Sequence, residues 1–246
     1  MSCSLSHLLP GRYRSGSVFV DPQYDLVVRF LSNTVGFGFR ITFTTLYKTA
    51  ETDKAMNFSR VPTLQRSLLT GGIGFGLVSL IVFATVAFGE RWMYERLGLM
   101  TAYLAWTALF IILGGGVLGS LVVGRWRLPW FYLLFGLAFL AYAVGWVGAY
   151  FFLRGTLGEW VGSLVGSFMM GSVLALGLGA RHSILKLCVI LFAANSSGYF
   201  LGSALNDYIG GSSGMLSWGT VYGICLGAGL GAVLHYGQAG QRVNQS

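Results

Sequence analysis

The chain contains few charged residues. Lys, Arg, Asp and Glu make up 10% of its 246 residues, whereas apolar residues make up 54% and the mean hydropathy is +0.68. So little polar surface could not cover a soluble globule of this length, which excludes a water-soluble fold. The composition predicts a protein that has the lipid bilayer as its solvent.

Cysteine is also scarce. The three cysteines, Cys3, Cys188 and Cys225, form no CxxC motif and no Cys/His cluster, so we predict no disulfide framework, no metal site and no cofactor. The net charge of +8 comes from basic residues scattered at the ends of apolar segments rather than gathered on one face. This distribution argues against a nucleic-acid partner.

The first 65 residues lack a secretory signal, because no apolar run of 7–15 residues follows the opening charges. Two interpretations of residues 1–65 stay open. They form a small cytoplasmic extension, with a strand-like alternation of phenylalanine and polar residues over 37–44. Alternatively, translation naturally begins at Met56 and the upstream residues are not functional.

Six apolar stretches follow, each long enough to cross about 30 Å of hydrocarbon. None has a charged residue in its central part. The sequence therefore predicts an all-α, polytopic membrane protein with six transmembrane helices in a glycine-rich, tightly packed bundle. This domain covers residues 66–237, and 238–246 form a short cytoplasmic tail. The predicted spans are 67–89, 97–124, 129–153, 159–180, 184–206 and 215–236.

Charge sorts the connections between these spans into two groups. Basic residues lie directly before the first span and in the second and fourth connections, and every acidic residue after position 55 falls on the other side, which predicts that the basic regions are cytoplasmic. Both termini are then inside, in a bacterial inner membrane or its organellar equivalent. The basic residues are Arg60, Arg66, Arg125, Arg127, Arg181 and Lys186, and the acidic residues on the other side are Glu90, Glu95, Glu159 and Asp207.

Glycine, at 37 residues, recurs at helical spacing in several spans. A glycine at every fourth position leaves a groove without side chains, in which another helix backbone can lie. We predict that these ladders pack helices within the bundle, or against other subunits. They comprise Gly219, Gly223, Gly227 and Gly231 in the last span and Gly158, Gly162 and Gly166 in the fourth.

A Leu-Gly-x-Gly pattern recurs in the second, fourth and sixth spans, at 113–116, 176–179 and 226–229. These three spans run in the same direction in the predicted topology. The hairpins 67–124, 129–180 and 184–236 are therefore candidates for divergent copies of one unit, although a match this short also arises by chance in a glycine-rich chain.

The main polar candidate inside the membrane lies in the fifth span. An amide in hydrocarbon is costly unless it has a partner, so Asn195 must meet another helix, water or a ligand. Two interpretations follow: hydrogen bonding between helices, or a water-lined permeation path. The face concerned carries Asn195, Ser196, Gly198, Gly202 and Asn206.

One short motif resembles a catalytic site. Gly211-Ser212-Ser213-Gly214 resembles the GxSG turn of the rhomboid intramembrane proteases, whose serine pairs with a histidine on another helix. Here the downstream histidine, His235, follows Ser213 on the same predicted helix, roughly 33 Å away. A Ser/His pair needs hydrogen-bond reach, so we expect no catalytic residues.

Three functions remain as hypotheses. The spans contain no carboxylate at mid-depth, which argues against ion-coupled transport and favours a permease or channel-like protein for a small neutral solute. The alternative is a non-enzymatic accessory or scaffold subunit, whose ladders bind other transmembrane subunits or a second copy. A membrane-embedded enzyme is a remote third.

Overall fold

A computed structural model describes residues 61–123 and 127–243, with side chains for 61–123 and 128–239. The predicted strand-like segment at 37–44, the question of Met56, and Cys3 lie outside these residues. The described part of the chain is helical and has no strand. It belongs to the unit Asp53–Ser246, which is described here by itself.

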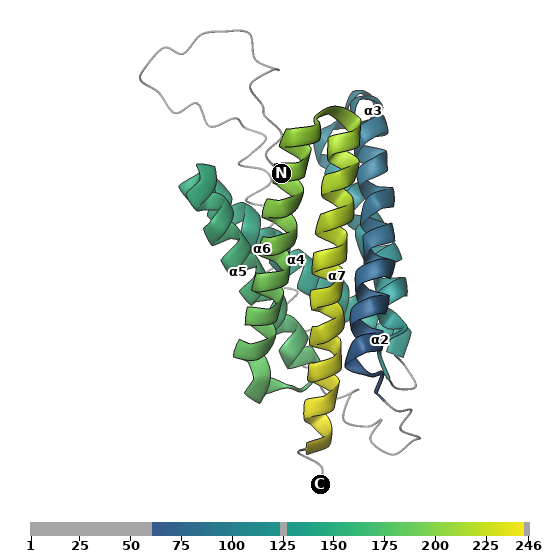
Figure 1. The fold of residues 1–246 in the computed structure, drawn as a ribbon, viewed down its shortest axis with the longest axis vertical. Coiled ribbons are helices and arrows are strands. Elements are labelled where there is room, and N and C mark those ends of the chain that lie inside the picture. The colour runs from purple at the N-terminus through teal and green to yellow at the C-terminus, as the bar shows by residue number, and fades with distance from the viewer. Residues whose placement is uncertain (1–60, 124–126, 244–246) are drawn as a thin grey trace. The chain divides into compact units, whose positions relative to one another are not determined.

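Five helical segments are long and apolar enough to cross a membrane, as expected of a multi-pass membrane protein (Figure 1). The first contains α2 (Leu64–Leu69), the π-helix η2 (Thr70–Gly74) and α3 (Phe75–Gly119), which follow one another without a break. The others are α4 (Arg127–Leu153), α5 (Gly155–Gly177), α6 (Ile184–Ile209), preceded by the 3-10 turn η3 (Arg181–Ser183), and α7 (Gly211–Val243). The all-α prediction is confirmed, but the predicted count of six helices is not.

The difference in count lies in the first segment. Helical residues continue up to and beyond Gly98, which alone leaves the helix, at φ 75° and ψ 162°. The sequence predicts a connection at 90–96, yet these residues stay helical, and Arg91 Nε donates to Glu95 Oε1 at 2.9 Å, one turn along. The predicted span 67–89 and most of the span 97–124 therefore fall in one helical segment, Leu64–Gly119, which is interrupted only at Gly98.

The two halves of α3 pack against each other around Gly98. Val82 and Val86 from the first half share a buried cluster with Ala102 and Trp106 from the second. Straight, the 45 residues of α3 would extend roughly 68 Å, more than twice the hydrocarbon thickness. The fold back at Gly98 brings each half within the length that a bilayer accommodates (Figure 1).

A turn at a residue with a positive φ occurs three times. Gly98 (φ 75°, ψ 162°), Arg154 (φ 53°, ψ 167°) and Gly210 (φ 72°, ψ 168°) each separate two helices or helix halves, and successive turns are 56 residues apart. At the second and third turns the next residue, Gly155 (φ 56°) or Gly211 (φ 59°), also has a positive φ. Arg154 is the one described residue other than glycine with a positive φ. An L side chain is strained in this region of backbone space.

The pattern of buried residues also repeats at intervals of 56 residues. Positions 56 residues apart are buried together in the first, second and third pairs of helices. Examples are Phe75, Phe131 and Leu187; Leu118, Leu174 and Leu230; and Trp106, Gly162 and Trp218.

The helices pack in a closed order. α4 packs on α5, α5 on α6, α6 on α7, and α7 on α2, η2 and α3, while α3 also meets α4. Large apolar side chains fill the interior, including Phe75, Phe131, Phe135 and Leu191. The neighbours α6 and α7 lie side by side along their length in Figure 1.

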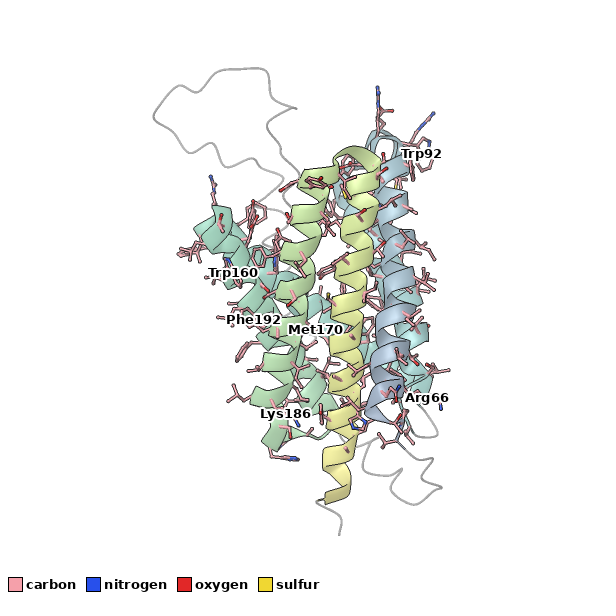
Figure 2. The ribbon with its side chains drawn as sticks, viewed as in Figure 1. Arg66, Trp92, Trp160, Met170, Lys186 and Phe192 are labelled. Carbon is pink, nitrogen blue, oxygen red and sulfur yellow. The ribbon has the colours of Figure 1, made fainter. Side chains whose placement is uncertain are left out.

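Charged residues divide between the two ends of the unit. The end that we call the mixed end holds the three turns at Gly98, Arg154 and Gly210, with Glu90, Arg91, Glu95, Arg96, Glu159 and Asp207. The opposite end, the basic end, holds Arg66, Arg127, Arg181, His182, Lys186 and His235 and no acidic residue among those described. Figure 2 shows Arg66 and Lys186 near one end and Trp92 near the other.

A buried glutamine ties the end of α7 to the end of α3. Gln238 Nε2 donates to the carbonyl oxygens of Leu121 and Leu234 at 3.1 and 2.9 Å, and its Oε1 accepts from the backbone N–H of Val123 at 2.9 Å. The carbonyls and N–H groups that a helix end leaves unpaired thus find partners. Gln238 belongs to α7, which continues to Val243 through residues that the sequence assigned to a tail.

Candidate functional site

Five polar side chains from four helices form one hydrogen-bonded group, which we call the polar cluster. They are Tyr142 (α4), Ser163 (α5), Asn195 and Ser196 (α6) and Tyr222 (α7). The asparagine and the two serines are buried and the two tyrosines are half-buried.

Asn195 lies at the centre of the polar cluster and is 1% exposed. Its Oδ1 accepts from the hydroxyls of Tyr142 at 3.0 Å and Tyr222 at 3.2 Å. Its Nδ2 donates to Ser163 Oγ at 2.8 Å, and that oxygen lies 2.7 Å from Ser196 Oγ. The oxygen and the nitrogen of the amide both have protein partners, so the cost of burying an amide in hydrocarbon is offset within the bundle.

Glycines position the two tyrosines. The ring of Tyr142 lies over Gly166 of α5, where an added Cβ would come within 2.9 Å of Tyr142 Cδ2. The backbone of Tyr222 lies over Gly198 of α6, where an added Cβ would come within 3.1 Å of Tyr222 Cα. Without these side chains the helices approach closely enough for both hydroxyls to reach Asn195.

A second group of rings lies next to the polar cluster, one helical turn along α6. Tyr199 lies between Trp146 and Trp218, with ring centroids 6.0 and 5.8 Å apart. The indole nitrogens Trp146 Nε1 and Trp218 Nε1 are buried and have no hydrogen-bond partner among the described residues. Two donors are therefore unpaired close to the amide of Asn195, whose Oδ1 and Nδ2 both have partners.

The face predicted on α6 is covered by α7. Gly198 meets Tyr222, Gly202 meets the indole of Trp218, and the carbonyl of Asn206 lies 2.7 Å from an added Cβ at Gly214. Asn195 and Ser196 lie in the polar cluster. Of the predicted face, Asn195, Ser196, Gly198 and Gly202 are buried and Asn206 is partly exposed.

The glycines of the predicted ladder in α7 face the first helical segment. An added Cβ at each would contact a residue of that segment, and at Gly227 and Gly231 the contact is with a backbone carbonyl. The pairs are Gly219 with Phe83, Gly223 with Ser79, Gly227 with Gly71, and Gly231 with Ser67.

The glycines of the predicted ladder in α5 face α4. Their partners recur every fourth residue and are aromatic, so each ring or its backbone lies over a glycine. The pairs are Gly158 with Tyr150, Gly162 with Trp146, and Gly166 with Tyr142. The order is antiparallel, as two helices joined at Arg154 require.

The rhomboid-like motif lies away from its downstream histidine. Ser213 is exposed in the first turn of α7 at the mixed end. His235 lies at the basic end, where its Nδ1 is 2.9 Å from the carbonyl oxygen of Pro62. Among the described residues, no three His, Cys, Asp or Glu side chains gather as a metal site would require.

The sequence indicated Asn195 and Ser196 but not their partners. Tyr142 and Tyr222 are ordinary residues of apolar spans, and the hydroxyl of a serine such as Ser163 commonly bonds to its own helix backbone. The available signal was the glycine opposite each tyrosine, since a glycine in one helix marks where a large side chain of another can lie.

Two grooves open on the outer surface of the unit. The larger, about 680 Å³, lies between α2, α6 and α7 and is lined by Leu64, Leu68, Leu185, Lys186, Val189, Ile190, Ala232 and Tyr236. The smaller, about 540 Å³, follows the first half of α3 and is lined by Ile81, Ala84, Thr85, Phe88, Gly89, Trp92 and Met93. No residue of the polar cluster lines either groove.

Comparison of the chain with protein-family models, curated proteins and solved structures found no match.

Proposed function

We propose that this protein is a non-enzymatic scaffold or accessory subunit that crosses the membrane six times. The observation that carries the proposal is the pairing of Asn195 with Tyr142, Tyr222 and Ser163. These bonds use the most polar group of the interior to join α4, α5, α6 and α7. Because Oδ1 and one N–H of Asn195 are used in this way, the arrangement favours a role in holding helices together over the binding of a passing solute.

Six crossings are supported by the turn at Gly98. Gly98 has nearly the same φ and ψ as Arg154 and Gly210 and lies 56 residues before the first of them, although a second residue with a positive φ follows only Arg154 and Gly210. The burial pattern recurs with this interval too. These repeats favour three helix hairpins that are copies of one unit, related by an axis along the membrane normal.

The orientation follows from the charges at the two ends. Basic residues concentrate on the cytoplasmic side of membrane proteins, so we assign the basic end, with Arg66, Arg181 and Lys186, to the cytoplasm. We infer a bacterial inner membrane or its organellar equivalent from the same asymmetry.

The scaffold role is tested by purification and by flux. We expect the protein, extracted in a mild detergent from its own membrane, to elute with a stoichiometric membrane partner or as a defined oligomer. Liposomes that contain it should shrink in water, glycerol and urea gradients at the rate of protein-free liposomes. A monodisperse monomer without a partner would contradict the scaffold role.

A neutral-solute permease is the second candidate. The unpaired indole nitrogens of Trp146 and Trp218 favour it, since buried donors without partners are costly unless water or a ligand meets them. This function predicts solute flux that is lost in Asn195→Leu and kept in Gly148→Ala, a change at a glycine with nothing within 4 Å of an added Cβ. Such a result would replace the scaffold proposal.

A further inference from the structure

The larger groove combines an apolar surface with one cation. Leu68, Val189 and Ala232 are among the residues that line it, and Val189 is 50% exposed. Lys186 lies at the basic end of this lining, in the first turn of α6. The volume of about 680 Å³ falls within the roughly 300–1,000 Å³ that is typical of small-molecule sites.

Lys186 is held in place by a ring. Its Nζ lies 3.5 Å from the centroid of Tyr236, a cation–π contact that keeps the ammonium group over the groove. No anion of the described residues pairs with this charge. The described acidic residues, Glu90, Glu95, Glu159 and Asp207, are all at the mixed end, so none is available to Lys186.

The charge is a feature of this groove alone among the three repeats. The positions 56 and 112 residues before Lys186 are Trp130 and Gly74, neither of which carries a charge. Positions equivalent to Val189, in contrast, remain apolar, as Leu133 and Leu77. The repeat thus explains the apolar lining, but Lys186 is an addition to it.

We propose that this groove binds one anionic phospholipid. An acyl chain would lie along Leu68, Val189 and Ala232, and the phosphate would pair with the ammonium group of Lys186. The order of these contacts matches the bilayer, because the cation is at the end of the helix, where headgroups lie, and the apolar lining continues toward the middle. The inference requires that the chain lies in a bilayer but does not depend on the scaffold role.

The test measures lipid binding to the full chain in detergent by native mass spectrometry. Phosphatidylglycerol and phosphatidylcholine with the same acyl chains serve as probes. We expect the wild type to retain one phosphatidylglycerol in preference to phosphatidylcholine. Lys186→Gln should weaken phosphatidylglycerol binding about fivefold, which corresponds to about 1 kcal/mol for one lysine near a membrane surface. Lys186→Arg should restore it.

Two matched controls separate the groove from general effects. Arg91→Gln removes one exposed cation at the mixed end and should leave lipid binding unchanged. Val189→Trp fills the groove and should reduce binding of phosphatidylglycerol, whereas Leu77→Trp, at the equivalent exposed position of the first repeat, should not.

Three results would overturn the proposal. They are equal binding of the two lipids by the wild type, unchanged phosphatidylglycerol binding in Lys186→Gln, and unchanged binding in Val189→Trp. A dimer that dissociates in Val189→Trp would also overturn it, because a second copy would then occupy the groove. Because the substituted side chains are exposed, we expect all variants to fold. The melting temperature of each variant checks this.

Discussion

A methyl group at Gly227 tests how closely α7 approaches the first helical segment. An added Cβ there would overlap the carbonyl oxygen of Gly71 and lie 2.6 Å from Phe75 Cβ and 2.9 Å from the carbonyl carbon of Gly71. Carbon atoms in good contact are about 3.5–4.0 Å apart. Much of the obstruction is backbone, which no rotamer change relieves, so Gly227→Ala must push the two helices apart by roughly 1 Å.

The cost has two terms of opposite sign. Overpacking of a close-packed interior costs about 1–3 kcal/mol, and a clash with backbone belongs at the upper end of that range. The higher helix propensity of alanine than of glycine raises the free energy of unfolding by about 1 kcal/mol. We therefore expect Gly227→Ala to lower the free energy of unfolding by about 2 kcal/mol. Gly148→Ala, in α4, meets nothing within 4 Å and should be neutral or stabilising by up to about 1 kcal/mol.

The assay is reversible unfolding of the purified protein in mixed micelles, with sodium dodecyl sulfate as denaturant and helix content as the signal. Wild type, Gly227→Ala and Gly148→Ala are compared under identical conditions. Equal stability of the two alanine variants would refute the reasoning, because it would show that the contact between Gly227 and Gly71 does not limit how α7 packs.

Three further predictions follow from the polar cluster, the turns and the charges. Asn195→Leu removes three hydrogen bonds worth about 0.6 kcal/mol each, so the free energy of unfolding should fall by about 2 kcal/mol. In a double-mutant cycle with Ser163→Ala, the two losses of stability should be non-additive. Strict additivity would argue against the hydrogen bond between Asn195 and Ser163. Arg154→Gly should stabilise the protein by about 1 kcal/mol, because glycine adopts a positive φ without strain, whereas Gly210→Ala should destabilise it. A loss of stability in Arg154→Gly, or a gain in Gly210→Ala, measured by thermal unfolding, would contradict this account of the turns. A reporter enzyme that works only in the cytoplasm should be active when fused after residue 182. Activity there of a reporter that works only in the periplasm would reverse the assigned orientation.

The helices of the fold could be predicted because hydrocarbon imposes a simple rule. Each crossing needs about 20 residues with few charges, and every backbone group must bond within the helix. The segments that contain Asn195 and Gly227 satisfied this rule, and both lie in helices of membrane-spanning length. Nothing in such a rule depends on how one helix is rotated against another.

The place where the first helical segment turns could not be predicted because polar residues need not end a helix. The segment around Arg91 and Glu95 is charged enough to suggest a connection, but the two side chains pair across one helical turn and support the helix instead. The reversal needs only Gly98, at a positive φ. A single glycine among 37 carries no signal of its own until its equivalents, Arg154 and Gly210, are seen at the same interval.

The candidate site could be predicted in part for a related reason. Asn195 stands out in an apolar span because a buried amide must be paired. Its partners Tyr142 and Tyr222 are 53 and 27 residues away in the sequence, on other helices. Which ring meets which amide depends on the helix rotations that the glycines permit, and those are properties of the packed bundle.

Asn195 differs from the residues at the equivalent positions of the 56-residue repeat. Positions equivalent to Asn195 in the first two hairpins are Phe83 and Phe139, which fill space without needing a partner. In the proposed three-hairpin arrangement, two hairpins have a phenylalanine at this position, so the hairpin itself does not require an amide. Since Asn195 requires partners from α4, α5 and α7, it makes the interface between the second and third hairpins unlike the other two. In the proposed pseudo-symmetric bundle, this interface alone has such hydrogen bonds. Variants at this interface, rather than at the two equivalent interfaces, should change what the protein does.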